Sequence, residues 1–174
     1  MTRKLCLCLM LFLMTEILPG AEESNQMREV ILENVTRTHE GVVLALRSID
    51  TIDLVHIVVG EAEGLSISLA LRREKFTRPL THDLFKNFLD RNGWRVEKVV
   101  IRDIQGGAFL ADLVLGKDET KEIFDARPSD AIALGVRYGA KILVSEKVLE
   151  RERKRKREKK SRPFSEKQTT ERKL

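Results

Sequence analysis

The stretch VVIRDI, residues 99–104, has the same order of apolar and polar positions as VILENV, residues 30–35. Each stretch is followed by two more apolar segments bounded by turn residues, and then by a segment with helical spacing. The helical segments also resemble each other, since SISLALR at 66–72 matches AIALGVR at 131–137. Two copies of a unit of three strands and a helix, about 65 residues apart, therefore predict an α+β fold in which helices pack on a mixed β-sheet.

The predicted elements follow from the spacing of apolar residues in each segment. Runs rich in Val, Ile and Leu indicate strands, and apolar positions three and four residues apart indicate helices. The predicted strands are 28–35, 41–46, 53–60, 96–104, 108–116, 121–126 and 140–145, and the predicted helices are 61–75, 81–93 and 128–139.

Charge is distributed unevenly along the 174 residues, which is the length of one domain. Residues 151–174 hold 12 Lys and Arg against 4 Glu, a net charge of +8, whereas residues 1–150 sum to −3. We therefore place the folded domain at 28–150 and predict that 151–174 is a disordered basic tail. The alternative is a solvated charged helix that frays at Pro163. Such a tail either attracts phosphates without specificity or only adds solubility.

The first 21 residues have the layout of a secretory leader, with two basic residues before an apolar run from Leu5 to Met14. The run is too short to span a bilayer. Glu16 and Pro19 depart from the usual leader pattern. Residues 22–27 are interpreted as a linker.

The leader decides where the protein is expected to act. With a leader the chain is exported to the periplasm or the medium, and without one the protein starts at Met27 and is cytoplasmic. Both cysteines, Cys6 and Cys8, lie in the leader. A processed chain would therefore contain no disulfide and no cysteine-based metal site.

The segment FDARPSDAIAL, residues 124–134, contains more charged residues than a helix start requires. We expect Ser129 to accept hydrogen bonds from the free N–H groups of the following turn, and Asp130 to suit the positive end of the helix dipole. Asp125 and Arg127 have no role in starting a helix, so they are candidates for a functional site.

A second segment, RPLTHDLF, repeats this arrangement with Arg78, Thr81, His82 and Asp83. An arginine beside the free N–H groups of a helix N-terminus can bind a phosphate. His82 adds a side chain of the type that titrates near neutral pH, so it is the candidate general acid or base. The alternative is a pair of capped helices joined by an Arg–Asp ion pair.

A third acidic segment, VGEAEG, places Glu61 and Glu63 at a junction between a strand and a helix. Glutamates at a helix start gain from the helix dipole without any catalytic role. Together with Asp83, Asp125 and Asp130 they could instead bind a divalent cation such as magnesium. No spacing in the sequence identifies a metal.

Other functional patterns are not found in the sequence. His39 lies in a predicted hairpin turn, and His56 lies inside an apolar strand, where a structural role is expected. There is no phosphate-binding Walker loop, no HExxH and no GxSxG. Aromatic residues make up only 5% of the chain, so a platform for stacking nucleic-acid bases is not expected.

Four segments together resemble the bifunctional nuclease domain family over residues 28–150. They are IVVGEAEGLSISLAL, RPLTHDLF, VEKVVIRDIQGGAFLADLVL and FDARPSDAIALGVRYGAKILVSEKVL. The resemblance implies an α+β fold with a duplicated β-rich unit, nuclease activity on DNA and RNA, and a homodimer. At Gly64 the sequence departs from the family, in which alanine is common.

The resemblance carries its characteristic positions onto Glu61, Glu63, Arg78, Pro79, Thr81, His82, Asp83, Asp125, Arg127, Pro128, Ser129 and Asp130. Our hypothesis is phosphodiester hydrolysis. It assigns binding of the phosphate to Arg78 and Arg127, with Thr81 and Ser129 beside them, and proton transfer to His82, oriented by Asp83 or another nearby carboxylate. It assigns positioning of a water molecule to Glu61, Asp125 and Asp130, directly or through a divalent cation. The rival hypothesis is a noncatalytic module that recognises a small anion or a protein partner.

Overall fold

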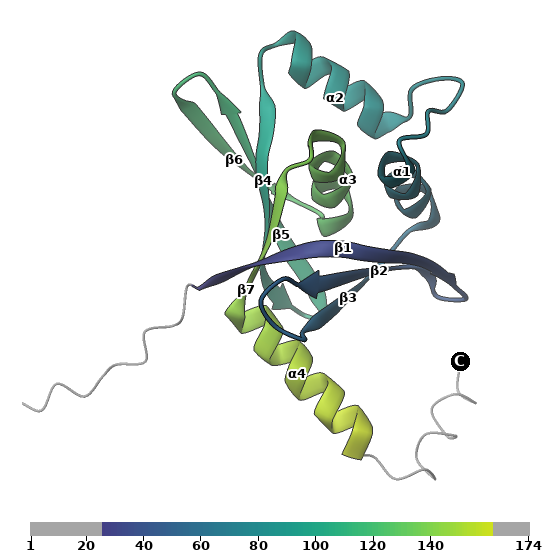
Figure 1. Cartoon of the computed structure of the whole chain (residues 1–174), viewed down its shortest axis with the longest axis vertical. Helices are drawn as coiled ribbons and strands as arrows, with labels where there is room; N and C mark the ends of the chain where they lie inside the picture. The colour runs from purple at the N-terminus through teal and green to yellow at the C-terminus, as the bar shows by residue number, and fades with distance from the viewer. Residues whose placement is uncertain (1–25, 162–174) are drawn as a thin grey trace, which may run out of the picture.

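Seven strands form one mixed sheet within residues 26–161, the part of the chain that the computed structural model describes (Figure 1). The strands are β1 (Met27–Thr38), β2 (Gly41–Ser48), β3 (Leu54–Val59), β4 (Arg95–Gln105), β5 (Ala108–Lys117), β6 (Thr120–Ala126) and β7 (Lys141–Ser145). The helices are α1 (Glu61–Arg72), α2 (Thr81–Arg91), α3 (Pro128–Tyr138) and α4 (Glu146–Ser161). The predicted leader, most of the linker at 22–27 and the tail beyond Ser161 lie outside the described residues.

The order of the strands, β3-β2-β1-β7-β4-β5-β6, shows the duplication directly. β1, β2 and β3 form one antiparallel meander that leads into α1, and β4, β5 and β6 form a second that leads into α3. β7 joins the two meanders, because it pairs antiparallel with β1 and parallel with β4. The predicted α+β fold with a repeated β-rich unit is therefore confirmed.

The two copies also share a local irregularity that the sequence match did not anticipate. One extra residue bulges out of β1 at Glu33, and one of the two that bulge out of β4 is Arg102. These residues occupy the same position in VILENV and VVIRDI. The next residue in each copy, Asn34 or Asp103, accepts a hydrogen bond through its side-chain oxygen from the following backbone N–H, at 2.8 and 2.7 Å. A shared bulge at matching positions supports the duplication more strongly than short apolar matches do.

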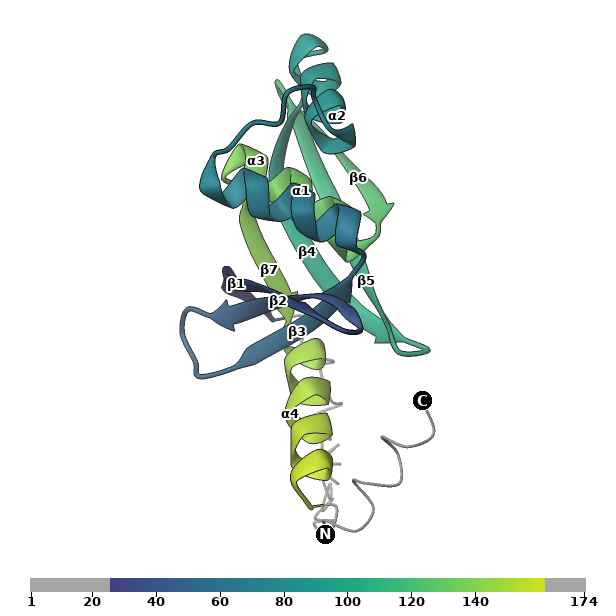
Figure 2. The same cartoon turned by 90° about the vertical axis from the view of Figure 1, so that its right-hand side faces the viewer.

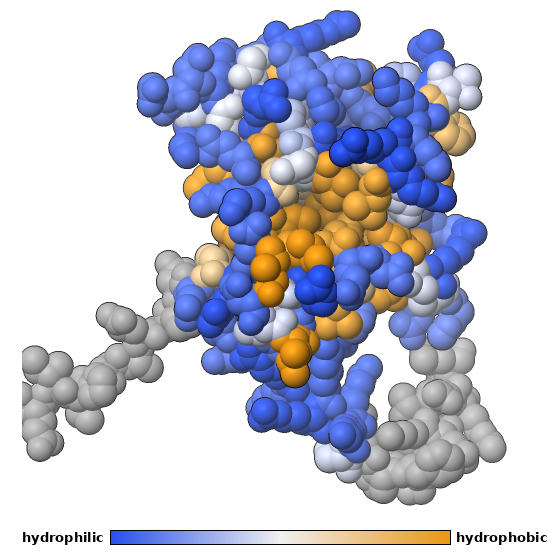
Figure 3. All heavy atoms as spheres, viewed as in Figure 1, coloured by the Kyte–Doolittle hydropathy of each residue, from blue (hydrophilic) through white to orange (hydrophobic). Residues whose placement is uncertain are grey.

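The hydrophobic core lies between the sheet and the pair of helices α1 and α3, which contact each other (Figures 1 and 2). Figure 3 shows apolar residues at the centre of this side of the molecule, bordered by hydrophilic ones. The fully buried side chains include Leu44, Leu46, Val55, Ile67, Val99, Ile101, Ile132 and Val144. None of the helices in the described part of the chain is long and apolar enough to cross a membrane.

Gly64 lets α1 approach the sheet closely. A Cβ atom added at Gly64 would lie 2.6 Å from the Cβ of Val42 on β2, a distance that requires the strand or the helix to shift. We predict that Gly64→Ala lowers the free energy of unfolding by about 1–2 kcal/mol, because an overpacking cost of about 1–3 kcal/mol exceeds the gain in helix propensity. The control is Gly116→Ala, where an added Cβ atom would meet only the flexible side chain of Glu97, which is exposed and can move away. Equal losses of unfolding free energy for the two variants in urea would contradict the overpacking at Gly64.

The basic segment after β7 is helical as far as Ser161, so the charged-helix interpretation describes it there and disorder does not. Val148 and Leu149 bury the first turns of α4 against the sheet. Further along, Arg153 donates to Asp53 in the loop before β3, with Nε 2.8 Å from Oδ1. From these contacts α4 extends away from α1, α2 and α3 (Figure 2).

The Asp53–Arg153 pair should make the stability of the protein depend on pH. The hydrogen bond from Arg153 lowers the pKa of Asp53 to about 2, below its ordinary value of 3.8. A lowered pKa means that the ionised carboxylate stabilises the fold by about 2 kcal/mol above pH 4, and that this contribution disappears as the pH falls toward 2.

We therefore predict that Asp53→Asn lowers the free energy of unfolding by about 2 kcal/mol at neutral pH and has much less effect at about pH 2. Urea unfolding monitored across this pH range measures both values. Asp50→Asn is the control, since Asp50 is exposed in the same loop. A pH-independent effect of Asp53→Asn would show that the ion pair is not responsible.

Candidate functional site

The N-terminus of α3 differs from its predicted form. The helix begins at Pro128, and its N-cap residue is Arg127, which makes no capping hydrogen bond through its side chain. Ser129 is the second residue of the helix and is buried, so the prediction that it caps the helix is wrong. Proline at the first position explains the shift, because its fixed φ angle suits a helix start and it has no N–H to satisfy.

His82, near the start of α2, lies between a hydroxyl group and a carboxylate. Its Nδ1 is 2.9 Å from Ser66 Oγ, and its Nε2 is 3.2 Å from Asp130 Oδ1. A carboxylate can only accept hydrogen bonds, so in the neutral ring Nε2 carries the proton and Nδ1 accepts from the Ser66 hydroxyl. Arg137 Nη2 donates to the same Ser66 oxygen at 2.9 Å. These four residues, from α1, α2 and α3, form one continuous hydrogen-bonded chain.

Asp83 does not orient His82, although it was one of the carboxylates considered for that role. Its Oδ2 accepts the backbone N–H of Leu80 at 3.0 Å, and its Oδ1 accepts from Arg137 Nε at 2.7 Å. Burial by itself would raise the pKa of Asp83, but these hydrogen bonds outweigh it and hold the pKa below its usual range. Asp83 therefore anchors the start of α2 to α3.

Arg127 joins α3 to the acidic start of α1. Its Nε lies 2.7 Å from Asp130 Oδ2, and its Nη2 lies 3.0 Å from both Asp130 Oδ1 and Glu63 Oε1. The side chain is still 67% exposed, and its Nη1 makes no hydrogen bond within residues 26–161. Arg127 therefore keeps donors for an anion that approaches from solvent.

Asp130 is the carboxylate shared by His82 and Arg127. Burial alone would raise its pKa, but the hydrogen bonds from Arg127 and His82 outweigh this effect and lower the pKa. Asp130 is consequently ionised at neutral pH and can stabilise a positive charge on the imidazole of His82.

Three other predicted site residues are not part of this hydrogen-bonded network. Glu61 is hydrogen-bonded to Arg37 of β1, in a different depression of the surface. Asp125 is paired with Arg102 at 2.7 Å. Arg78 is exposed between α1 and α2 and has no ion pair or hydrogen bond in the described part of the chain. The structure thus brings together His82, Asp130 and Arg127, and not the full set.

The acidic residues do not form a preformed cation site. Among residues 26–161, no three His, Cys, Asp or Glu side chains lie close enough together to hold a metal ion. Glu61, Asp125 and Asp130, for which a shared cation was one of the alternatives, each have an arginine partner.

Three depressions reach either His82 and Asp130 or their neighbour Arg127. A small one of about 290 Å³ is lined by Glu63, Ser66, Thr81, His82, Arg127 and Asp130. A second, of about 480 Å³, runs from Arg127 and Ser129 to Arg155 of α4. A third, of about 730 Å³, begins at His82 and Asp130 and continues between α2, β5 and β6. A long ligand could therefore pass from the basic helix to His82.

Ser66 and Arg137 are the members of the site that sequence reasoning missed. Ser66 is 2% exposed, and the Arg137 side chain is 6% exposed. A buried serine and a buried arginine on apolar helices need polar partners. The sequence contains this signal, a polar residue within an apolar helical segment. Ser66 lies in SISLALR and Arg137 lies in AIALGVR, and both segments were used only as evidence for the repeat.

Comparison with known proteins adds independent information. A sequence model of the bifunctional nuclease domain family matches residues 37–157. An uncharacterized protein of Mycobacterium tuberculosis is 36% identical over 107 residues, covering 62% of this chain and 63% of the relative.

Plant relatives match over a smaller share of their own length. Bifunctional nuclease 2 of Oryza sativa subsp. japonica is 36% identical over 94 residues, covering 52% of this chain and 29% of the relative. Bifunctional nuclease 2 of Arabidopsis thaliana is 31% identical over 110 residues, covering 62% and 33%. The chain spans less than two thirds of the length of each of these relatives.

Proposed function

The chain belongs to the bifunctional nuclease domain family, and from this premise we propose that it hydrolyses phosphodiester bonds of DNA and RNA at His82, Asp130 and Arg127. The observation that carries the proposal is the position of His82, held by Asp130 and Ser66 beside a partly free arginine. A residue for proton transfer and a residue for phosphate binding are the two groups that such a hydrolysis requires.

Arg127 binds the scissile phosphate. Its guanidinium keeps Nη1 free for a phosphate oxygen, and phosphate recognition by arginine is strong because the hydrogen bonds are charge-assisted. The depression that connects Arg127 to Arg155 gives the polyanion a path toward α4, whose basic residues release counterions when they neutralise phosphates. This path offsets the acidic character of the rest of the domain.

His82 accepts the proton that the attacking water loses. Because Nδ1 faces the Ser66 hydroxyl, the proton moves through that group: Ser66 donates its proton to Nδ1 and takes one from the water. The water oxygen forms the new bond to phosphorus as the bond to the leaving oxygen breaks, and solvent protonates the leaving alkoxide. Asp130 stabilises the resulting imidazolium through Nε2, as an orienting carboxylate does in other His-based sites.

The test is turnover on single-stranded and duplex DNA and on RNA, measured with EDTA and with added magnesium. The expected result is multiple-turnover cleavage by the wild-type protein that is lost in a His82 variant purified in parallel. Binding of nucleic acid without cleavage under all of these conditions would favour the noncatalytic module instead.

A further inference from the structure

The third depression has an unusual lining for a chain with few aromatic residues. Its walls carry Phe85 and Phe88 of α2, Phe124 of β6, and Trp94. Phe85 and Phe88 are nearly parallel, with an angle of 8° between the rings and 6.3 Å between their centroids. We call this depression the aromatic groove. A low aromatic content therefore does not by itself exclude a stacking surface, because four aromatic side chains line one depression.

The aromatic groove exists because α2 does not bury its apolar side. Of its apolar residues only Leu89 is buried, whereas Phe88 is 58% exposed and Phe124 across the groove is 49% exposed. Figure 2 shows α2 at the same end of the molecule as β6. Exposed aromatic rings on both walls of an open groove leave apolar surface for a flat ligand.

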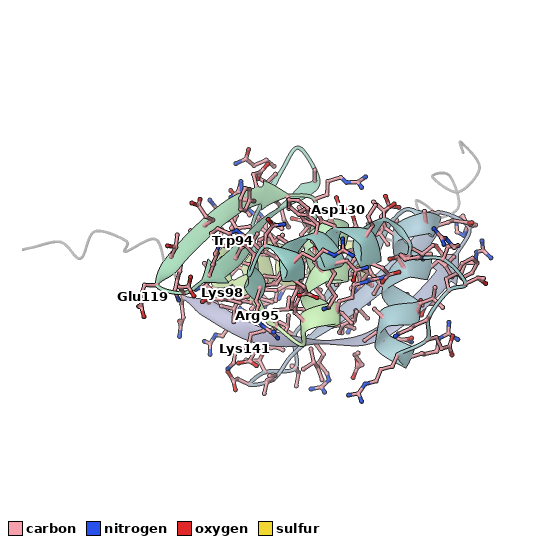
Figure 4. The ribbon with its side chains drawn as sticks, turned by 90° about the horizontal axis from the view of Figure 1, so that it is seen from above. Trp94, Arg95, Lys98, Glu119, Asp130 and Lys141 are labelled. Carbon is pink, nitrogen blue, oxygen red and sulfur yellow. The ribbon has the colours of Figure 1, made fainter. Side chains whose placement is uncertain are left out.

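One end of the aromatic groove is the proposed catalytic site. His82, Thr81 and Asp130 line both the aromatic groove and the small depression beside Arg127. In Figure 4, Trp94 and Asp130 lie on one side of the molecule, and Arg95 and Lys141 lie on the other. A nucleotide whose phosphate binds Arg127 would therefore have its base at the mouth of the groove.

The polar groups of the aromatic groove are mainly acceptors. Glu122 lines it, and its side chain makes no hydrogen bond or ion pair within the described residues. Asp125 lines it as well, with Arg102 as its partner. A carboxylate accepts hydrogen bonds from the exocyclic amino group of cytosine or adenine, and it repels the carbonyl oxygens of thymine and uracil.

We propose that the aromatic groove binds an unpaired nucleobase next to the phosphate held by Arg127, and that it favours bases with an amino group over thymine and uracil. The base stacks on the phenylalanine rings while Glu122 accepts its amino group. A base inside a duplex is already stacked and paired, so its faces are not available. The protein therefore prefers single-stranded or unpaired substrates. The role of Arg127 in this inference rests on the proposed function.

Trp94 makes the proposal measurable, because it is the only tryptophan of the chain and lines the aromatic groove. The experiment titrates the full-length protein with short oligodeoxycytidylate and oligothymidylate that carry cleavage-resistant phosphorothioate linkages, and follows Trp94 emission. The expected result is quenching by both, with oligodeoxycytidylate binding roughly 10-fold more tightly, as one directional hydrogen bond to a base edge allows. In Glu122→Gln this preference should shrink to near unity.

Phe88→Ala tests the stacking surface. It should weaken oligodeoxycytidylate binding roughly 10-fold, the size expected for the loss of one stacked base. Phe76→Ala is the matched control, because Phe76 is also 58% exposed but lies outside the aromatic groove. It should bind like the wild type. Thermal unfolding of both variants verifies that they are folded.

Three results would overturn the proposal. If the wild-type protein cleaves nucleic acid, but its Trp94 emission does not change on binding and Phe88→Ala binds with full affinity, the base site in the aromatic groove is refuted. The proposed nuclease activity is then unaffected. Equal affinity for the two oligonucleotides would refute the role of Glu122. A monomer–dimer equilibrium abolished by Phe88→Ala would show that a second copy covers the groove. Quenching that depends on Phe88, without any cleavage, would instead support the base site and refute the proposed hydrolysis.

Discussion

Replacing His82 by alanine is expected to lower the turnover number for nucleic-acid cleavage by about 10²- to 10⁴-fold, the usual contribution of a general acid or base. The substitution removes the acceptor of the Ser66 proton and the partner of Asp130. The fold should survive, because Ser66 keeps its hydrogen bond from Arg137 and Asp130 keeps Arg127. The loss of two hydrogen bonds should cost about 1–3 kcal/mol of stability.

The measurement compares initial rates on a fluorogenic oligonucleotide with thermal unfolding of the same samples. His39→Ala is the matched control, because the His39 side chain is 91% exposed in the turn after β1. It should retain wild-type activity. Wild-type activity in the His82 variant would refute the assignment. The rate would then come either from another site of this chain or from trace nucleases of the expression host, which would give all three proteins the same rate.

Most of the fold follows from patterns that the sequence displays. The structure has the predicted order of strands and helices, and the majority of the element ends differ from the predicted ones by one to three residues. Helix α1 ends earlier than predicted, because Arg73 takes a left-handed conformation and its N–H closes the last turn. That conformation has no clear signal in a run of charged residues.

The start of α4 shows why the basic segment was harder to predict. Its composition resembles a disordered tail, yet Arg151 and Arg153 pair with Asp103 and Asp53, residues 48 and 100 positions away. Whether a charged helix forms depends on partners that only the folded sheet brings near. Local composition contains no information about them.

The candidate site was predicted only in part, because its arrangement also depends on partners that are distant in the sequence. The two helix starts identified His82, Arg127 and Asp130, because arginine and acids before a helix are recognisable locally. The packing of the elements in the fold then places Glu61 beside Arg37 and Asp125 beside Arg102. A list of charged residues does not show which of Glu61, Asp125 and Asp130 contacts His82. Because the three carboxylates have different partners, replacing them one at a time tests which of them supports activity.

Asp130→Asn is expected to lower the turnover number by about 100-fold with little change in the fold, because it removes the group that sets the tautomer of His82. One oxygen of Asp130 accepts from His82 and the other accepts from Arg127 Nε. An asparagine must present its NH₂ group to one of them. It then either opposes an arginine donor or forces the proton from Nε2 to Nδ1, where His82 no longer accepts from Ser66.

Asp125→Asn is the matched control, since Asp125 lines the same groove and also pairs with an arginine but does not contact His82. It should stay within a few-fold of wild-type activity, roughly the effect of a surface ion pair. Hydrogen bonds from Arg127 and His82 hold the pKa of Asp130 below its usual range, so its protonation should not limit the wild-type rate at neutral pH. Equal losses in both variants would mean that negative charge in the groove, and not the contact with His82, supports catalysis. The contrast between two aspartates five residues apart in sequence therefore tests the mechanism at the level of one hydrogen bond.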